Sequence, residues 1–164
     1  MSSNVRKIKS ADKDTLTSLI NDYVKEYVPT EKVYPAKYDP HIGKIYFDEI
    51  AKKDSNFLVL IAEDGGREIG FSIAEVHKFG RIEKAYFEGD RRGEVWDIYV
   101  KPEFRGNGVG RQLLEEIEKE LLKQGCQNIT LNSVAMDNES ARRMYEKMGY
   151  RPFNMRYYKR VGQK

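Results

Sequence analysis

The sequence predicts a mixed α/β domain in which helices both precede and interrupt the strands of one sheet. Hydrophobic periodicity supports this fold class, because it gives the element order β-α-α-β-β-β-α-β-α-β. A glycine-rich turn at residues 105–110 also joins a β-type run directly to a long amphipathic helix pattern. The 164 residues suffice for one domain with a sizeable core, so we expect a single domain over residues 1–164.

A first strand and two helices are expected before the central strands. Val5–Ile8 can form a short strand, and Asp12 is a plausible N-cap for a helix that Pro29 ends. The apolar residues of that helix recur at helical spacing and would form one face: Leu16, Leu19, Ile20, Tyr23, Val24 and Tyr27. Asp39-Pro40 resembles an N-cap followed by proline at the first helical position, which predicts a second helix to about Lys53.

A β-hairpin is expected next. The apolar run at residues 57–62 predicts a buried strand, and Asp64-Gly65-Gly66 is a turn signal. The partner strand alternates to about Val76. Residues 77–93 are charged with scattered aromatics, and they fit either an extension of this strand or a loop.

The second half of the chain alternates strand and helix. Val95–Val100 reads as a strand that leads into the glycine turn, and the helix after the turn has its stop signal at Gly125. Residues 129–134 predict another strand. Asp137 or Asn138 would cap a last helix that Gly149 ends, and alternation over residues 151–161 predicts a final strand.

Composition excludes several classes of protein. The net charge of +3, from 29 basic and 26 acidic residues, is too balanced to favour nucleic acid, and no run of five basic residues occurs. No apolar run is long enough to span a bilayer, and we expect no signal peptide. Cys126 is the only cysteine, which excludes an intrachain disulfide or a Cys-based zinc site and fits a reducing, cytoplasmic compartment. His41 and His77 lack metal-ligand spacing, so no metal is expected.

The glycine turn is the strongest functional signal in the sequence. Glycines let the backbone approach a ligand closely, and the first amides of a helix are unpaired beside the positive end of its dipole. We therefore expect a phosphorylated ligand here, although a plain strand-to-helix connection is the alternative. The P-loop pattern is absent, and a dinucleotide fingerprint is broken because its third glycine position holds Arg111.

Two segments carry a resemblance to a known family. The order Val-x-Pro-x-x-Arg-Gly-x-Gly-x-Gly at residues 100–110 resembles the acyl-CoA signature of the GNAT superfamily of N-acetyltransferases. Asn-x-x-Ala-x-x-x-Tyr-x-x-x-Gly-Tyr at residues 138–150 resembles the second acyl-CoA segment of that family. The resemblance is specific over residues 94–150 and only topological before them. It implies a mixed, mostly antiparallel central sheet flanked by about four helices, with acetyl-CoA as cosubstrate.

The resemblance also implies how acetyl-CoA is held. Backbone amides of the turn would take the pyrophosphate, and the pantetheine arm would bond the strand at residues 98–100 like an added strand. An amide near Val100 would face the thioester oxygen. The expected cofactor-binding residues are Ile98, Tyr99, Val100, Arg105, Gly106, Asn107, Gly108, Val109, Gly110, Arg111 and Asn138. Arg105 could instead support the turn, and Asn138 could instead be a helix N-cap.

Two catalytic roles follow from the same resemblance. Tyr145 would be the general acid that protonates the leaving thiolate, although periodicity alone makes it a core residue. Glu94 is the first candidate for the base and Asp97 the second, because strand alternation places Glu94 with Trp96 and Ile98 and turns Asp97 to the other face. Either carboxylate could be only a solvated charge, since a bound amine can also lose its proton to water.

The acceptor implied by the family is a primary amine that attacks the thioester directly. Its pocket would lie near residues 27–38 and 153–158, which are rich in tyrosine, and aromatic faces can hold a cation. The resemblance leaves open whether the amine belongs to a small molecule, a peptide or a protein, and a homodimer is compatible with the sequence. A covalent route through Cys126 is disfavoured, because this thiol lies at a helix end away from both segments. The alternatives are a non-catalytic acyl-CoA-binding or sensing domain and, less favoured by charge, a nucleic-acid-binding module.

Overall fold

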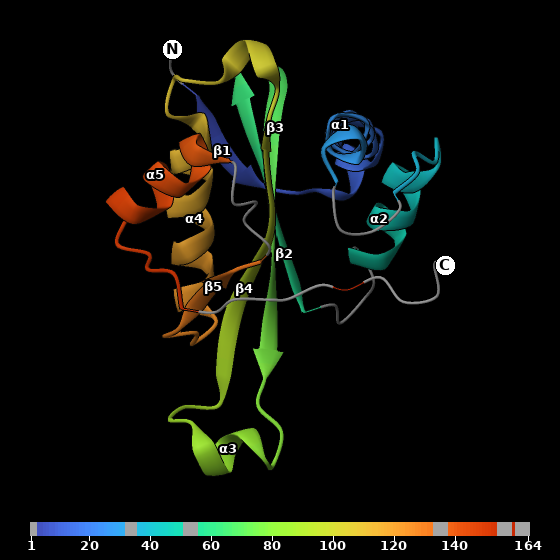
Figure 1. The fold of residues 1–164 in the computed structure, drawn as a ribbon. Coiled ribbons are helices and arrows are strands. Elements are labelled where there is room, and N and C mark those ends of the chain that lie inside the picture. Colours follow the sequence, from blue (N-terminus) through green and yellow to red (C-terminus); the bar gives the residue numbers. More distant parts are fainter. Residues whose placement is uncertain (1–2, 32–35, 51–55, 133–137, 154–158, 160–164) are drawn as a thin grey trace.

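The fold is a central sheet between two layers of helices (Figure 1). The computed structural model of the chain describes residues 3–31, 36–50, 56–132, 138–153 and 159. The strands are β1 (Asn4–Lys7), β2 (Phe57–Asp64), β3 (Arg67–Lys78), β4 (Arg91–Val100) and β5 (Ile129–Leu131). The helices are α1 (Lys13–Tyr27), α2 (Ile42–Ile50), α3 (Glu83–Tyr86), α4 (Val109–Lys123) and α5 (Glu139–Lys147).

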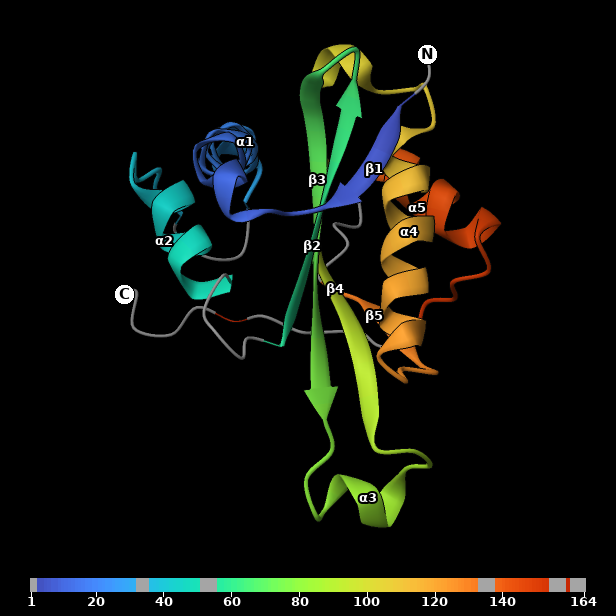
Figure 2. The ribbon, with the colours of Figure 1, turned by 180° about the vertical axis from the view of Figure 1, so that it is seen from behind.

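The sheet is mixed and mostly antiparallel, as predicted. Its strands lie in the order β1-β2-β3-β4-β5, and each of the first four is antiparallel to its neighbour. Only β4 and β5 run parallel. Helices α1 and α2 cover one face, and α4 and α5 cover the other, as the two opposite views show (Figures 1 and 2). We call these the α1 face and the α4 face of the sheet.

The first two helices form where the sequence predicts them. Helix α1 ends before Pro29 and buries Leu16, Leu19 and Ile20 against the α1 face. Asp12 occupies its N-cap position, but the Asp12 carboxylate binds Arg6 at 2.7 and 2.9 Å instead of an α1 amide. The predicted capping role of the Asp12 side chain is therefore wrong, because the charged, partly buried guanidinium of Arg6 offers it a stronger bond.

Helix α2 packs closely on α1. The Asp39 carboxylate accepts a hydrogen bond from the His41 amide at 2.8 Å, and the helix begins at Ile42. A Cβ at Gly43 would collide with the Thr17 carbonyl, so this glycine lets the two helices touch. The predicted extension of this helix to Lys53 lies outside the described residues.

Residues 77–93, which the sequence left undecided, extend the β3–β4 hairpin. β3 continues to Lys78, β4 starts at Arg91, and the short helix α3 joins them. Figures 1 and 2 show this hairpin projecting beyond the rest of the sheet, with α3 at its tip. The tip is held by the buried Phe79, whose ring lies 5.8 Å from that of Phe87.

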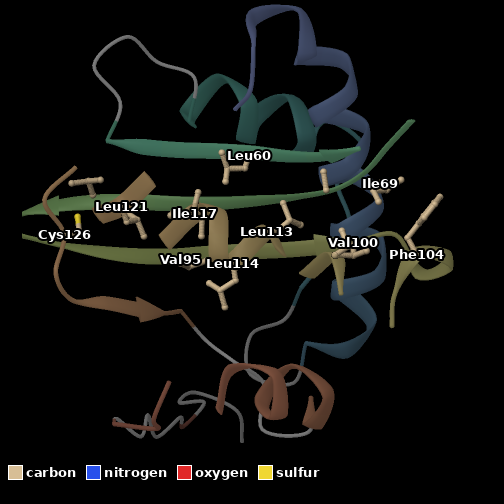
Figure 3. Close-up of a cluster of buried hydrophobic side chains, with 14 residues drawn as sticks. Leu60, Ile69, Val95, Val100, Phe104, Leu113, Leu114, Ile117, Leu121 and Cys126 are labelled. Atoms are coloured by element: carbon tan, nitrogen blue, oxygen red, sulfur yellow. The ribbon is translucent and has the colours of Figure 1, made fainter. Parts of the chain in front are cut away.

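The larger core lies on the α4 face. The apolar stripe of α4 points into it, and Figure 3 shows Leu113, Leu114, Ile117 and Leu121 beside side chains from the sheet. Cys126 is fully buried in the same cluster, and burial raises the pKa of its thiol. This environment fits the expected structural thiol rather than a reactive one.

The last helix begins and ends as predicted. The Asn138 side chain accepts a hydrogen bond from the Ala141 amide at 3.2 Å, and Gly149 ends the helix at a φ of 92°. Asp137, the other candidate cap, lies outside the described residues. The final strand predicted over residues 151–161 is absent at 151–153, and the rest of it falls almost wholly outside the described residues. No helix in the described part of the chain has the length and apolar character needed to cross a membrane.

Candidate active site

The glycine turn takes up the conformation that its composition allows. After β4, a short 3-10 turn at Pro102–Phe104 leads to Gly106 and Gly108, whose φ angles are 77° and 84°. Such left-handed angles are rare for residues with a side chain. A Cβ at either glycine would meet nothing within 4 Å, so the space above the turn is open.

The amides of this turn form a row of unpaired donors. Gln112 is the first residue of α4 whose amide has a backbone acceptor, the Gly108 carbonyl at 3.0 Å. Among the described residues, nothing accepts a hydrogen bond from the amides of residues 106–111. No acidic side chain lies in the first turn of α4. Unpaired amides at the positive end of a helix dipole bind anions such as phosphate.

A free strand edge leads to this turn. β4 pairs with β5 only from Gly93 to Val95, and the Asn132 amide donates the last bond, 2.9 Å, to the Val95 carbonyl. Beyond that point no described strand pairs with this edge of β4. The Lys101 amide donates to the Ile69 carbonyl at 2.8 Å. Because antiparallel bonds alternate, the backbone groups of Ile98 and Val100 face the open side.

This alternation also divides the expected cofactor residues of the strand. Ile98 and Val100 present backbone groups to the open edge, whereas the backbone of Tyr99 faces β3. The Tyr99 side chain is buried on the α1 face. Tyr99 therefore offers no backbone group to a ligand at the open edge and only separates the two residues that do, Ile98 and Val100.

A β-bulge at Trp96 changes which side chains share a face. Ile73 of β3 lies opposite Asp97 and Ala74 lies opposite Val95, so Trp96 has no partner. Val95 and Val100 both join the α4-face core, although residues five apart in a regular strand lie on opposite faces (Figure 3). The extra residue reverses the faces of everything in β4 before it.

The predicted positions of the two candidate bases are therefore corrected. Asp97 reaches Tyr23 of α1, and Glu94 lies opposite Glu75, two residues from the α1-face residue Ile73. Glu94 and Asp97 thus share the α1 face, whereas Ile98 packs toward the α4 face. Strict alternation fails because the bulge shifts the register by one residue.

Asp97 is hydrogen-bonded to a tyrosine of helix α1. Tyr23 donates a hydrogen bond of 2.7 Å from its hydroxyl to Oδ1 of Asp97. Burial raises the pKa of Asp97, and the Tyr23 hydrogen bond opposes this effect. Burial and the nearby Asp97 charge raise the pKa of Tyr46 to about 12, so both tyrosines stay protonated at neutral pH. A carboxylate with a raised pKa suits proton transfer.

Glu94 belongs to a second group on the same face. Nε2 of His77 lies 2.9 Å from Glu94 and 3.3 Å from Glu75. This buried nitrogen has no aligned hydrogen bond to either carboxylate. Both carboxylate side chains are 19% exposed, which leaves each of them accessible from solvent.

Aromatic rings line the α1 face around these carboxylates. The Phe57 and Trp96 rings meet edge to face at 5.0 Å, and the Tyr23 ring lies 5.8 Å from Tyr99 and 5.9 Å from Tyr27. Trp96 and Tyr27 remain 37% and 42% exposed. Residues 32–35 and 154–158 of the expected acceptor pocket lie outside the described residues.

Tyr145 lies on α5 and packs toward the α4-face core. Burial raises the pKa of its hydroxyl, which keeps the protonated form. Its ring lies 6.2 Å from that of Tyr150, whose hydroxyl donates to Glu118 at 2.6 Å. The Tyr145 hydroxyl, in contrast, bonds no residue in the described part of the chain.

The structure brings the two sequence segments together. A Cβ on Gly110 would lie 3.8 Å from the sulfur of Met144 and 3.8 Å from the Val100 side chain. The first turn of α4, the end of β4 and helix α5 therefore meet at Gly110. Tyr145 follows Met144 directly in α5, so the candidate acid lies close to the point where these three elements meet.

The polar side chains of the turn mostly support the protein itself. Arg105 binds the Val100 carbonyl and Glu26, and Nδ2 of Asn107 donates to the carbonyls of Phe104 and Arg105 at 3.3 and 3.2 Å. Arg111 pairs with Glu115 at 2.8 Å. The turn therefore offers chiefly its backbone to a ligand.

Sequence reasoning missed three residues of the site. Tyr23 and Glu26 are spaced like ordinary helix residues, and only the fold places them against β4. Alternation with Ile73 could have placed Glu75 on the α1 face, but only the hairpin register sets it opposite Glu94. No three described His, Cys, Asp or Glu residues come together in a way that could hold a metal ion.

Comparison with known proteins gives a consistent result. The model of the acetyltransferase (GNAT) family matches residues 16–150. An uncharacterized N-acetyltransferase of Archaeoglobus fulgidus is 33% identical over 139 residues, which cover 84% of this chain and 88% of that protein. Another, from Methanocaldococcus jannaschii, is 27% identical over 143 residues, which cover 87% of this chain but only 59% of that protein.

Solved structures share the fold. The aminoglycoside 6'-N-acetyltransferase AAC(6')-IG of Acinetobacter haemolyticus superposes with a TM-score of 0.67 at 19% identity, covering 98% of this chain and 99% of that one. AAC(6')-Iy, solved with a bisubstrate analogue of CoA and acetylneamine, has a TM-score of 0.74 at 18% identity, covering 99% and 100%.

Proposed function

This chain belongs to the GNAT family of acetyltransferases, and from that premise we propose that it moves an acetyl group from acetyl-CoA to a primary amine. The amine would attack the thioester directly. The observation that carries the proposal is the row of unpaired amides at residues 106–111, at the end of a free strand edge. This arrangement can hold a pyrophosphate and an extended arm in one line.

The cosubstrate would bind mainly through the backbone. Amides of residues 106–111 would hold the pyrophosphate, and the edge groups of Ile98 together with the Val100 amide would bond the pantetheine arm, since the Val100 carbonyl accepts from Arg105. The Val100 amide, on the open side of β4, would polarise the thioester oxygen. Asn138 would contact the cosubstrate through its amide nitrogen, because its oxygen already caps α5.

Tyr145 would be the general acid. As the amine nitrogen bonds the carbonyl carbon, the carbon–sulfur bond breaks and the sulfur takes the proton of the Tyr145 hydroxyl. Two observations support this role: the hydroxyl has no partner among the described residues, and burial keeps it protonated. A tyrosine fixed by another protein group, such as Tyr150, would be a poorer donor.

Glu94 would be the base, acting through water on the ammonium group of the acceptor. It lies on the α1 face and stays partly exposed beside His77. Asp97 shares that face and is the second candidate, favoured by its raised pKa. We further propose that the acceptor is a small-molecule or peptide amine that approaches from the aromatic α1 face, and that the reaction takes place in the cytoplasm.

The proposal is tested by calorimetric titration with acetyl-CoA, followed by a free-thiol assay against a panel of amines. We expect saturable binding, and release of one thiol for each acetylated amine with at least one amine class. Binding without thiol release for any amine would favour the non-catalytic acyl-CoA-binding domain. A complete lack of binding would remove the assignment of the glycine turn.

A further inference from the structure

The Arg105 side chain is bound by groups of the protein itself. Nε donates to the Val100 carbonyl at 2.8 Å, and the two terminal nitrogens lie 2.7 and 2.6 Å from the two carboxylate oxygens of Glu26. All three guanidinium nitrogens are therefore engaged. The guanidinium also lies over the Tyr99 ring, with 5.7 Å between its carbon and the ring centroid.

We propose that Arg105 is a positioning residue, which ties helix α1 to the strand that binds the pantetheine arm, and that it is not a phosphate ligand. The proposal rests on the proposed function, because it takes β4 as the cosubstrate strand and α1 as part of the acceptor wall. It predicts that Arg105 controls acceptor binding rather than acetyl-CoA binding.

The geometry of the Arg105–Glu26 contact indicates that it persists when a ligand binds. A single exposed ion pair is worth little, and both side chains here are 45% exposed. The Arg105–Glu26 pair, however, is bidentate, which adds geometric specificity. The same guanidinium also satisfies the Val100 carbonyl, which no strand pairs within the described residues. To reach a phosphate, Arg105 would have to leave Glu26, the Tyr99 ring and that carbonyl together.

The position of Glu26 gives a second argument. It lies in the last turn of α1, where the negative end of the helix dipole disfavours an acidic side chain. Arg105 offsets this cost, and within the described residues Glu26 forms no other ion pair. The pairing with Glu26 raises the pKa of Arg105, so the guanidinium keeps its charge.

The contact acts on the acceptor side of the molecule. Glu26 lies three residues after Tyr23, on the same side of α1, and Tyr23 bonds Asp97 of β4. Arg105 and Asp97 therefore hold the last two turns of α1 against β4 and the turn that follows it. If the Arg105–Glu26 contact is lost, Tyr23 and Tyr27 can move relative to the open edge at Ile98–Val100.

The test compares Arg105→Ala, Glu26→Gln and the double variant. We expect acetyl-CoA Kd to change less than about threefold in each, while the KM of the best amine rises about fivefold with little change in kcat, as for the loss of one charge-assisted contact. The double variant should be no worse than Arg105→Ala, because the ion pair that Glu26→Gln removes is already lost in that variant. Arg105→Lys should not restore KM, since an ammonium lacks the planar fork.

Glu115→Gln is the matched control, because it removes the acidic partner of the other turn arginine, Arg111. It should leave the acceptor KM unchanged. Hydrogen exchange supplies a readout without an acceptor: amides of the last α1 turn should exchange faster in Arg105→Ala, while acetyl-CoA still protects residues 106–111.

A loss of acetyl-CoA affinity of tenfold or more in Arg105→Ala, with Glu26→Gln unaffected, would overturn the proposal and make Arg105 a phosphate ligand. Unchanged exchange in α1 would overturn it as well. These outcomes differ from a failure of the proposed function, in which the unaltered protein would itself not bind acetyl-CoA.

Discussion

The open edge of β4 and the α1 face of the same strand offer different chemical groups to a ligand. Along its open edge and in the glycine turn, the groups available to a ligand are backbone amides and carbonyls. On the α1 face the available groups are side chains, chiefly carboxylates and aromatic rings. A backbone site depends on chain conformation and tolerates changes of most side chains, whereas a side-chain site changes with each substitution. We infer that the edge holds the cosubstrate and that the α1 face selects the acceptor.

Gly108→Glu should have the largest effect, because it tests the backbone site that we assign to the pyrophosphate. Glutamate would place a negative charge where the pyrophosphate should lie, at a position whose φ of 84° also disfavours a side chain. We expect acetyl-CoA affinity to fall by roughly a hundredfold or more, since a repulsive charge replaces a favourable site. Calorimetric titration measures the change.

Gly89→Glu is the matched control for this variant. Gly89 has a φ of 85° and open space around it, but it lies near the tip of the β3–β4 hairpin. It reproduces the strain and the added charge away from the turn and should bind acetyl-CoA normally. Equal affinity of Gly108→Glu and the unaltered protein would place the pyrophosphate elsewhere.

Tyr145→Phe tests the side chain that we propose acts on the cosubstrate as the general acid for the leaving thiolate. We expect kcat to fall roughly a hundredfold, within the usual range for general acid catalysis, with acetyl-CoA Kd nearly unchanged. Stability should change little, because the lost hydroxyl has no partner among the described residues. Tyr150→Phe, which loses a bond to Glu118, should instead lower stability and spare kcat. Full turnover in Tyr145→Phe would return Tyr145 to the core.

The α1 face is tested by the pH dependence of two variants. Glu94→Gln should depress kcat/KM several-fold, mainly at low pH, where the amine is most fully protonated and most needs a base. Asp97→Asn should do so instead if Asp97 is the base. The acid limb of the unaltered enzyme would then lie at higher pH than an ordinary aspartate gives, because burial raises the pKa of Asp97. If both variants keep the original profile, water takes the proton.

Asp97→Asn should also change stability, with the smallest effect. The raised pKa means that the folded protein disfavours ionised Asp97, so the stability found at low pH is lost as pH rises through that pKa. Asparagine removes this loss and keeps an oxygen for Tyr23. At pH 7 we expect Asp97→Asn to be more stable by about 1 kcal/mol, the size of an ordinary single-substitution effect, or roughly 2–4 °C in Tm.

Thermal unfolding at pH 3 and pH 7 measures this effect. The two proteins should unfold at nearly the same temperature at pH 3. Asp90→Asn is the control, because Asp90 is exposed and its pKa is lowered by Arg91. A lower Tm for Asp97→Asn at pH 7 would show that Asp97 is stabilised as an anion.

Sequence reasoning succeeded where a local physical rule decides the structure. Glycine at positive φ, the Asn138 cap and the amphipathic stripe of α4 each depend on neighbouring residues, and each is found in the structure. The family resemblance then turned the glycine turn into an expected acyl-CoA site. The fold class followed from the order of these elements.

It failed where long-range pairing decides. The extension of the hairpin through residues 77–93 depends on the pairing of two charged strands, which has no apolar alternation to mark it. The bulge is equally hidden, because Trp96 looks like any strand residue. The roles of Tyr23 and Glu26 required a helix to be placed against a strand some seventy residues later, as the contact between Tyr23 and Asp97 shows.

The bulge has an evolutionary consequence. Loss of the single codon for Trp96 would keep the chain in frame and could leave β4 paired with β3. Val95 would stay opposite Ala74 and Glu94 opposite Glu75, so both side chains would keep their present faces. One deletion would thus remove the half-exposed Trp96 ring beside Phe57 while leaving the acidic lining and the glycine turn untouched. A short insertion or deletion in this strand is therefore a direct route by which relatives could diverge in the amines they accept.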